Sequence, residues 1–120
     1  MSKHSVMGTM LADISRQQRE QQRAVTERDT QLAIVDLLRK AGWYVRVFSQ
    51  PRHVLQCLVG WPDVVAFKHG VVLLIEVKSP TGKPRAAQVD FWCDIEPHLS
   101  ASLLYIVARS VDDVLARMEE

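Results

Sequence analysis

The chain has 120 residues, of which 48% are hydrophobic and 24% charged, and its formal net charge is +1. This length suits one domain with a real core and is too short for two. No apolar run approaches the roughly 20 residues that a membrane span needs, and the N-terminus lacks the apolar core of a signal peptide, so we expect a cytoplasmic protein without a membrane partner. At this charge a nucleic-acid binder must concentrate its cations locally, so composition neither supports nor excludes that class.

Residues 1–25 differ from the rest and are predicted to be a helical arm or tail. Their apolar side chains follow helical spacing, at Met7, Met10, Leu11 and Ile14. The segment 15–23 is then almost wholly Arg, Gln and Glu, and a helix that is polar all round has little to hold it. One interpretation is therefore a frayed, solvated helix. The other is an arm that packs on a partner subunit or contacts phosphates.

Residues 26–120 are predicted to form a single α/β domain. Apolar periodicity and turn residues predict a helix at 26–40, strands at 43–49, 63–68 and 71–77, a helix at 85–95, a strand at 103–108 and a helix at 110–118. The helix at 26–40 is expected to carry a broad apolar stripe that includes Leu32. The two middle strands are apolar at nearly every position, so they should be central in a sheet and covered on both faces.

Cysteines and histidines give no metal motif. Cys57 and Cys93 lie far apart and match no zinc or redox spacing. We interpret them as reduced thiols, one or both buried. None of the four histidines has a partner at ligand spacing, and His69 is expected only to serve a turn.

The two middle strands bring a pair of carboxylates together. A two-residue turn at 69–70 would pair Lys68 with Val71. The same register places Asp63 directly opposite Glu76, with Cβ atoms about 4.5–5.5 Å apart on one face. Two carboxylates inside an apolar hairpin repel and are costly to desolvate. A bound divalent cation such as Mg²⁺ removes that cost, because hard cations take carboxylate oxygens as ligands.

Lys78 lies two residues after Glu76, so both side chains emerge on the same face of the strand. An ammonium beside two carboxylates and a metal can hold an attacking water or stabilise a phosphorane-like transition state. The alternative is a plain salt bridge at a strand end. The combination of Pro62-Asp63, a short hairpin and Glu76-Val77-Lys78 favours the catalytic interpretation.

Further residues of the predicted helices and of the loop after Lys78 are candidates on weaker grounds. Glu27 and Gln31 share the core-facing side of the first helix, where Glu27 could contact a hydrated metal or simply favour the helix dipole. Gln88 is a polar residue on an otherwise apolar helix stripe. Lys83 and Arg85 lie close in sequence to Lys78 and could contact phosphates, although a solvated surface position is equally compatible with their spacing.

These residues resemble the VRR-NUC nucleases, a branch of the PD-(D/E)XK superfamily. The resemblance is carried by Gly60-Trp61-Pro62-Asp63-Val64-Val65, Leu74-Ile75-Glu76-Val77-Lys78, Gly82-Lys83, Gln88, Val107-Ala108-Arg109-Ser110 and Asp112-Asp113, and backward by Glu27 with Gln31. It covers about residues 27–115. The chain departs from the family at 100–102, where Ser-Ala-Ser stands in place of a common glycine.

The resemblance implies a restriction-endonuclease-like α/β core, with a mixed central sheet and helices on both faces, that cuts phosphodiester bonds with Mg²⁺ or Mn²⁺. Asp63 and Glu76 would bind the metal together with the backbone carbonyl of Val77. Lys78 would act on the attacking water. Glu27 would complete the site through the metal or its waters, and Gln88 would orient the site or the substrate.

The expected function is therefore a Mg²⁺-dependent DNA endonuclease, with branched DNA such as a four-way (Holliday) junction as the expected substrate. Small stand-alone members of the family resemble phage or bacterial proteins, and some act as homodimers. A two-fold dimer would supply the two cuts that symmetrical resolution of a junction needs. The alternatives are a nuclease for linear duplex or flapped ends, a catalytically silent DNA-binding module on the same fold, and an oligomerisation protein whose carboxylates only form salt bridges.

Overall fold

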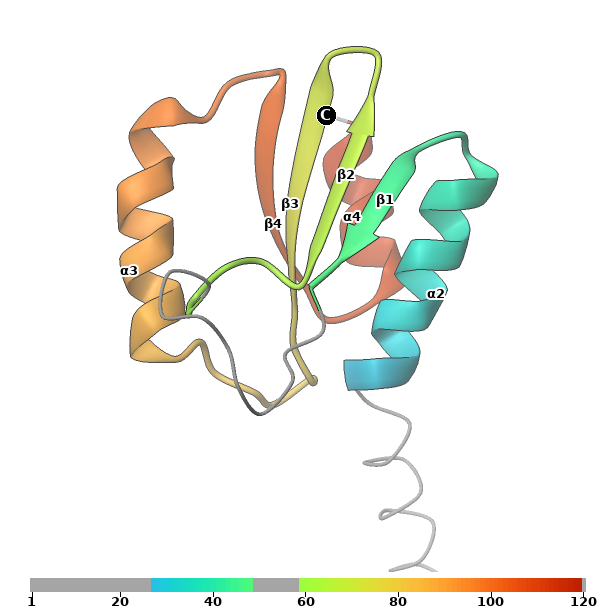
Figure 1. Ribbon diagram of the computed structural model, residues 1–120. Helices are drawn as coiled ribbons and strands as arrows, with labels where there is room; N and C mark the ends of the chain where they lie inside the picture. The colour runs from blue at the N-terminus through green and yellow to red at the C-terminus, as the bar shows by residue number, and fades with distance from the viewer. Residues whose placement is uncertain (1–26, 49–58, 120) are drawn as a thin grey trace, which may run out of the picture.

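Figure 1 shows the protein as a computed structural model, which describes residues 27–48 and 59–119. The elements are α2 (Glu27–Lys40), β1 (Tyr44–Val47), β2 (Val64–Lys68), β3 (Val71–Val77), α3 (Ala86–Ile95), the short 3-10 helix η2 (Glu96–His98), β4 (Leu103–Ala108) and α4 (Val111–Met118). The predicted order of helices and strands is confirmed for these ranges, with β1 shorter than expected. The arm at 1–25, its apolar stripe, Thr26 at the start of the predicted helix, and Cys57 lie outside the described residues.

The strands form one mixed sheet in the order β1-β2-β3-β4. β1, β2 and β3 are antiparallel neighbours, and β4 lies parallel to β3. The predicted hairpin register is confirmed, because Lys68 pairs with Val71 and Val64 pairs with Ile75. His69 and Gly70 both have positive φ, 48° and 79°, as a type I′ turn requires.

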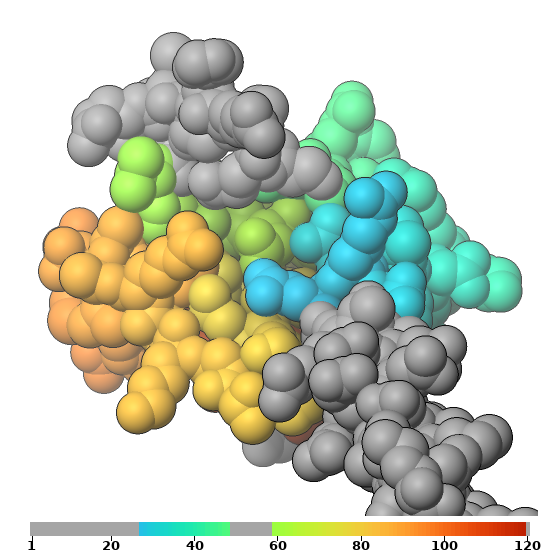
Figure 2. Space-filling model, turned by 90° about the horizontal axis from the view of Figure 1, so that it is seen from below, coloured from blue at the N-terminus to red at the C-terminus, as the bar shows by residue number. Residues whose placement is uncertain are grey.

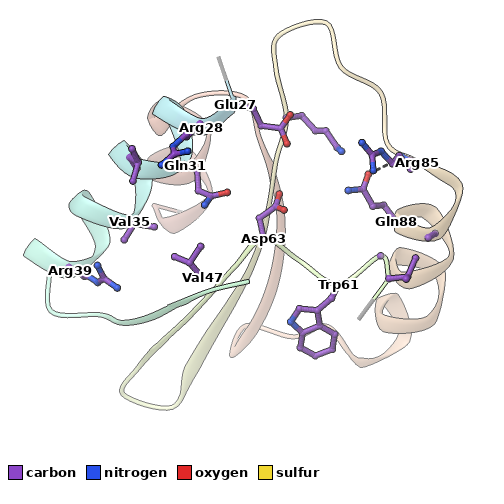
Figure 3. Close-up of a pocket in the computed structure, with 15 residues that line it drawn as sticks. Glu27, Arg28, Gln31, Val35, Arg39, Val47, Trp61, Asp63, Arg85 and Gln88 are labelled. Carbon is purple, nitrogen blue, oxygen red and sulfur yellow. Dashed lines mark hydrogen bonds between the residues drawn. The ribbon is translucent and has the colours of Figure 1, made fainter. Parts of the chain in front are cut away.

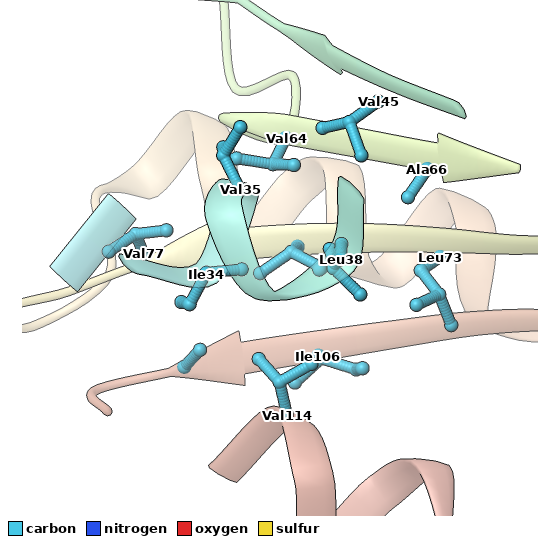
Figure 4. Close-up of a cluster of buried hydrophobic side chains, with 12 residues drawn as sticks. Ile34, Val35, Leu38, Val45, Val64, Ala66, Leu73, Val77, Ile106 and Val114 are labelled. Carbon is cyan, nitrogen blue, oxygen red and sulfur yellow. The ribbon is translucent and has the colours of Figure 1, made fainter. Parts of the chain in front are cut away.

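Helices cover both faces of this sheet, as predicted (Figure 1). On one face, α2 and α4 contribute Ile34, Leu38 and Val114 to a fully buried cluster with alternate residues of the central strands (Figure 4). On the other face, Phe91 and Ile95 of α3 pack against a smaller cluster around Tyr105. Side chains of β2 and β3 therefore alternate between two apolar layers, which explains why nearly every position in these strands is apolar.

One expectation about burial is corrected, and the option that both cysteines are buried is excluded. Leu32 is 55% exposed, because the sheet lies against the side of α2 that carries Ile34 and Leu38, and a residue two positions before Ile34 points elsewhere. Cys93 is a free, exposed cysteine, since it lies midway between the two α3 residues that face the sheet. No helix in the described ranges is long and apolar enough to cross a membrane.

Gly60 ties the entry of β2 to the start of α3. Its φ is +83°, and a Cβ built on it would lie 2.2 Å from the backbone carbonyl oxygen of Ala87. Gly70 has a similar φ of +79°, but a Cβ there would meet nothing within 4 Å. The first glycine is therefore required by both conformation and close approach, and the second by conformation alone.

We predict that Gly60→Ala lowers the free energy of unfolding by about 3 kcal/mol or more, because a left-handed conformation costs ~1–2 kcal/mol and the clash with backbone adds to it. Gly70→Ala is the matched control and should lose only about 1–2 kcal/mol. Urea unfolding of the two variants measures both losses. Equal losses would show that the contact between Gly60 and Ala87 does not constrain the fold.

Candidate functional site

The candidate site lies in a cleft at the end of the sheet where β3 finishes. The cleft opens on the face shown in Figure 2, between the start of α2, in blue, and the start of α3, in gold. Its volume is about 720 Å³. Its lining residues come from α2, from the end of β1, from the approach to β2, and from the segment that follows β3: Glu27, Arg28, Gln31, Leu32, Val35, Arg39, Val47, Val59, Gly60, Trp61, Asp63, Lys78, Arg85, Ala87 and Gln88.

Asp63 is fixed at the floor of this cleft by the hairpin. It immediately precedes β2, and the pairing of Val64 with Ile75 continues to Asp63 opposite Glu76. The backbone N–H of Val77 donates to Oδ2 of Asp63 over 2.8 Å. In an extended strand the N–H and C=O of one residue point toward the same neighbouring strand, so the Val77 carbonyl faces the same side as this carboxylate. The predicted grouping of Asp63, Glu76 and Val77 is thus present in the structure.

Glu76 is a buried carboxyl with an incomplete set of partners. Its side chain is 1% exposed. Oε1 accepts a hydrogen bond from Nε2 of Gln88 and lies 3.6 Å from the Nζ of Lys78. Oε2 is buried and has no hydrogen-bond partner. A buried oxygen of this kind costs free energy unless a proton or a cation occupies it.

The electrostatic consequence is a shifted titration of Glu76. Burial and the negative charge of Asp63 raise the pKa of Glu76 to about 8, against the opposing effect of the Lys78 ammonium. Burial and the charges of the same two carboxylates raise the pKa of Tyr105 to about 12. Burial is the larger cause of both shifts, and the neighbouring carboxylates add to it.

Gln88 connects the start of α3 to the buried carboxyl. Its Oε1 accepts from the backbone N–H of Arg85 over 2.8 Å (Figure 3). This bond orients the amide so that Nε2 donates to Glu76. The apolar stripe of the predicted helix indicated an inward-facing glutamine. The hydrogen bond that Gln88 donates to Glu76 explains why a polar side chain occupies this inward position.

Arg109 supports the site, a role that the sequence analysis did not predict. Its Nη1 donates to the backbone carbonyls of Ser79 and Gly82, both at 2.7 Å. It thereby holds the loop that leads from Lys78 to Arg85. Arg109 directly follows β4, which is buried and parallel to β3. Because the carboxyl ends of parallel neighbouring strands lie at one edge of the sheet, this position in the sequence could have indicated a basic residue close to Lys78.

The remaining candidates are distributed around the cleft. Glu27 and Asp63 point toward the same region (Figure 3), so Glu27 lies on the predicted side of the sheet. Among residues 27–48 and 59–119, no group of three or more His, Cys, Asp or Glu side chains is close enough to hold a metal ion. Glu27 is therefore not clustered with the other two carboxylates. Arg85 lines the cleft, and Lys83 is exposed outside its lining.

The chain was compared with known proteins. No protein-family model matches it, and no curated protein is similar enough to count as a relative. The fold and the geometry of the cleft therefore carry the functional argument.

The residues present fit a hard divalent cation. The carboxylates of Asp63 and Glu76 are oxygen donors on adjacent strands, and Oε2 of Glu76 is a buried acceptor without a donor. Mg²⁺ typically binds through one or two carboxylates and retains several waters, so a third protein carboxylate is not required. A cation between these groups would also relieve the repulsion that raises the pKa of Glu76.

We predict that the metal-free protein loses stability as pH rises from 5 to 9. The Glu76 carboxyl has a pKa of about 8 in the folded protein, against about 4.3 in an unfolded chain. The folded state therefore holds a proton that the unfolded state has released. The resulting stabilisation is complete below the unfolded pKa and is lost as pH rises through the folded one.

Thermal melts in EDTA at pH 5, 7 and 9 test this dependence. Relative to Glu76→Gln, the wild-type melting temperature should fall by at least about 4 °C, the shift expected for 1 kcal/mol in a domain of this size. Asp36→Asn removes an exposed carboxylate paired with Lys40 and should follow the wild type. If the melting temperatures of wild type and Glu76→Gln change with pH in the same way, the pH dependence does not come from Glu76.

Proposed function

We propose that the protein is a Mg²⁺-dependent DNA endonuclease with a restriction-endonuclease-like core and a catalytic set of the PD-(D/E)XK type. The supporting observation is the under-neutralised pair of the half-buried Asp63 and the buried Glu76, beside Lys78 at the floor of a cleft. A structural salt bridge would leave neither a carboxylate oxygen without a partner nor a second carboxylate opposite the first. The arrangement is suited to holding a cation against a phosphate.

In this proposal Asp63, Glu76 and the Val77 carbonyl hold Mg²⁺, and Mn²⁺ can substitute. The ion, when bound, supplies positive charge that polarises the phosphate and favours ionisation of a water. Gln88 fixes one oxygen of Glu76, so the other oxygen remains available to the ion. Because the ligands are already positioned by strand pairing, little reorganisation is needed at the moment of reaction.

Lys78 and Glu27 both line the cleft, and in this proposal both act on the reacting groups. The buried Lys78 ammonium can orient the attacking water and stabilise charge that develops on the phosphate oxygens. The water oxygen forms a new bond to phosphorus as the bond to the leaving oxygen breaks, and the water's proton passes to solvent. Glu27, which is not clustered with the other carboxylates, acts through water molecules.

Branched DNA is the proposed substrate, and the cytoplasm of a bacterial or phage-infected cell is the proposed location. A homodimer would present two such clefts to the two-fold symmetry of a four-way junction. A nuclease for linear duplex or flapped DNA ends would use the same catalytic residues and would differ from this proposal only in the DNA that it cuts. A silent DNA-binding module would leave the arrangement of Asp63, Glu76 and Lys78 without a role.

A Mg²⁺-dependent cleavage panel of single-stranded, duplex, flap and four-way-junction DNA tests the proposal. We expect cleavage, with the junction cut faster than linear duplex. Asp63→Asn, Glu76→Gln and Lys78→Met should each lower the rate by at least about 100-fold, the effect of removing one electrostatic stabiliser from an active site.

Matched controls separate catalysis from folding. Lys68→Met removes a lysine at the opposite end of the hairpin, where its Nζ donates to the Ala41 carbonyl, and Asp36→Asn removes an exposed carboxylate. Both should cleave like the wild type. Circular dichroism should show that all variants are folded. Cleavage near the wild-type rate by a folded Glu76→Gln would exclude the assigned site.

A further inference from the structure

The α2 wall of the cleft carries two arginines whose role the proposed catalytic set does not explain. Arg28 and Arg39 mark the two ends of this wall (Figure 3), and both line the cleft. Eleven residues of helix separate them, which corresponds to about 16 Å along the helix axis. Arg28 lies beside Glu27, near the carboxylates, and Arg39 lies about three helical turns away from it.

Neither guanidinium forms a salt bridge with a carboxylate of the described residues. In the described part of the chain, the salt bridges are Lys40 with Asp36 and Lys78 with Glu76, and neither includes Arg28 or Arg39. The neighbouring Lys40 on the same helix is paired over 2.8 Å and does not line the cleft. Arg28 and Arg39, two of the four cations that line the cleft, thus form no salt bridge within the described residues, whereas the adjacent Lys40 is paired with Asp36.

The lining of the cleft also includes exposed apolar side chains from three segments. Leu32 is 55% exposed, Val47 36% and Val59 46%, and all three line the cleft. They come from α2, the end of β1 and the approach to β2. We call these three side chains the apolar shelf. Exposed aliphatic groups gathered in a cleft typically mark a contact surface.

We propose that the α2 wall binds a nucleic-acid strand whose nucleotides are unpaired next to the cleavage site. Arg28 and Arg39 hold two of its phosphates, and the apolar shelf contacts sugars and base faces of the same strand. This inference rests on the proposed nuclease function and specifies its substrate. In a continuous duplex the base faces are stacked on one another, so only an unpaired strand presents both a charged backbone and apolar ring faces to one wall.

Binding measurements on the full chain in EDTA, where cleavage is blocked, test the inference. The probes are a fluorescein-labelled single strand and a blunt duplex of equal length, followed by anisotropy at several salt concentrations. We expect the single strand to bind more tightly than the duplex. Arg39→Gln should weaken single-strand binding and lower the slope of log Kd against log salt by about 0.7, the value for one phosphate contact to a single strand.

Two further variants separate charge from apolar contact. Lys40→Gln removes the same charge one residue along α2, outside the cleft, and should leave affinity and slope unchanged. Leu32→Ser should weaken single-strand binding without changing the slope, because an apolar contact releases no counterions. Equal effects of Arg39→Gln and Lys40→Gln, or a duplex that binds as tightly as the single strand, would overturn the inference.

The outcomes also distinguish this inference from the proposed function. Mg²⁺-dependent cleavage by a protein whose DNA binding is insensitive to Arg39→Gln overturns the binding wall and leaves the nuclease intact. Single-strand binding with the expected Arg39 dependence, but without Mg²⁺-dependent cleavage of any DNA, overturns the nuclease and leaves a binding cleft.

Discussion

The repulsion between two carboxylates, one of them sealed from solvent, is the interaction on which the rest of this site depends. The pairing of Val64 with Ile75 brings the preceding Asp63 next to Glu76, and the Val77 N–H holds the Asp63 carboxylate there. The protein supplies Gln88 and Lys78 to one oxygen of Glu76 and nothing to the other. The metal-free fold therefore has to keep a proton on this carboxyl, which its raised pKa reflects.

Several features away from the carboxylates hold the surrounding chain in place. Gly60 allows the chain before β2 to approach the Ala87 carbonyl, and Arg109 binds two carbonyls of the loop after β3. Both contacts fix the start of α3, which carries Gln88. A small displacement of this loop would turn the Gln88 amide away from Glu76. The loop conformation therefore matters to the site, although the loop supplies none of the proposed metal ligands.

The hairpin and its carboxylate pair could be predicted because they depend on local rules. Side chains alternate along a strand, and a two-residue turn at His69 and Gly70 leaves one register. The contribution of Arg109 depends on a loop conformation that no local pattern encodes. The exposure of Leu32 depends on which side of α2 meets the sheet, and a broad apolar stripe leaves that choice open. Arg28 and Arg39 share a wall of the cleft only once α2 has packed against the sheet.

Isothermal titration of the full chain with Mn²⁺ at pH 7, in two buffers of different ionisation enthalpy, tests the central claim most directly. A cation that takes the place of the proton on Glu76 must release that proton to the buffer. The account predicts binding to the wild type with a buffer-dependent heat, and neither binding nor proton release for Glu76→Gln. The absence of Mn²⁺ binding, or equal binding by wild type and Glu76→Gln, would contradict it.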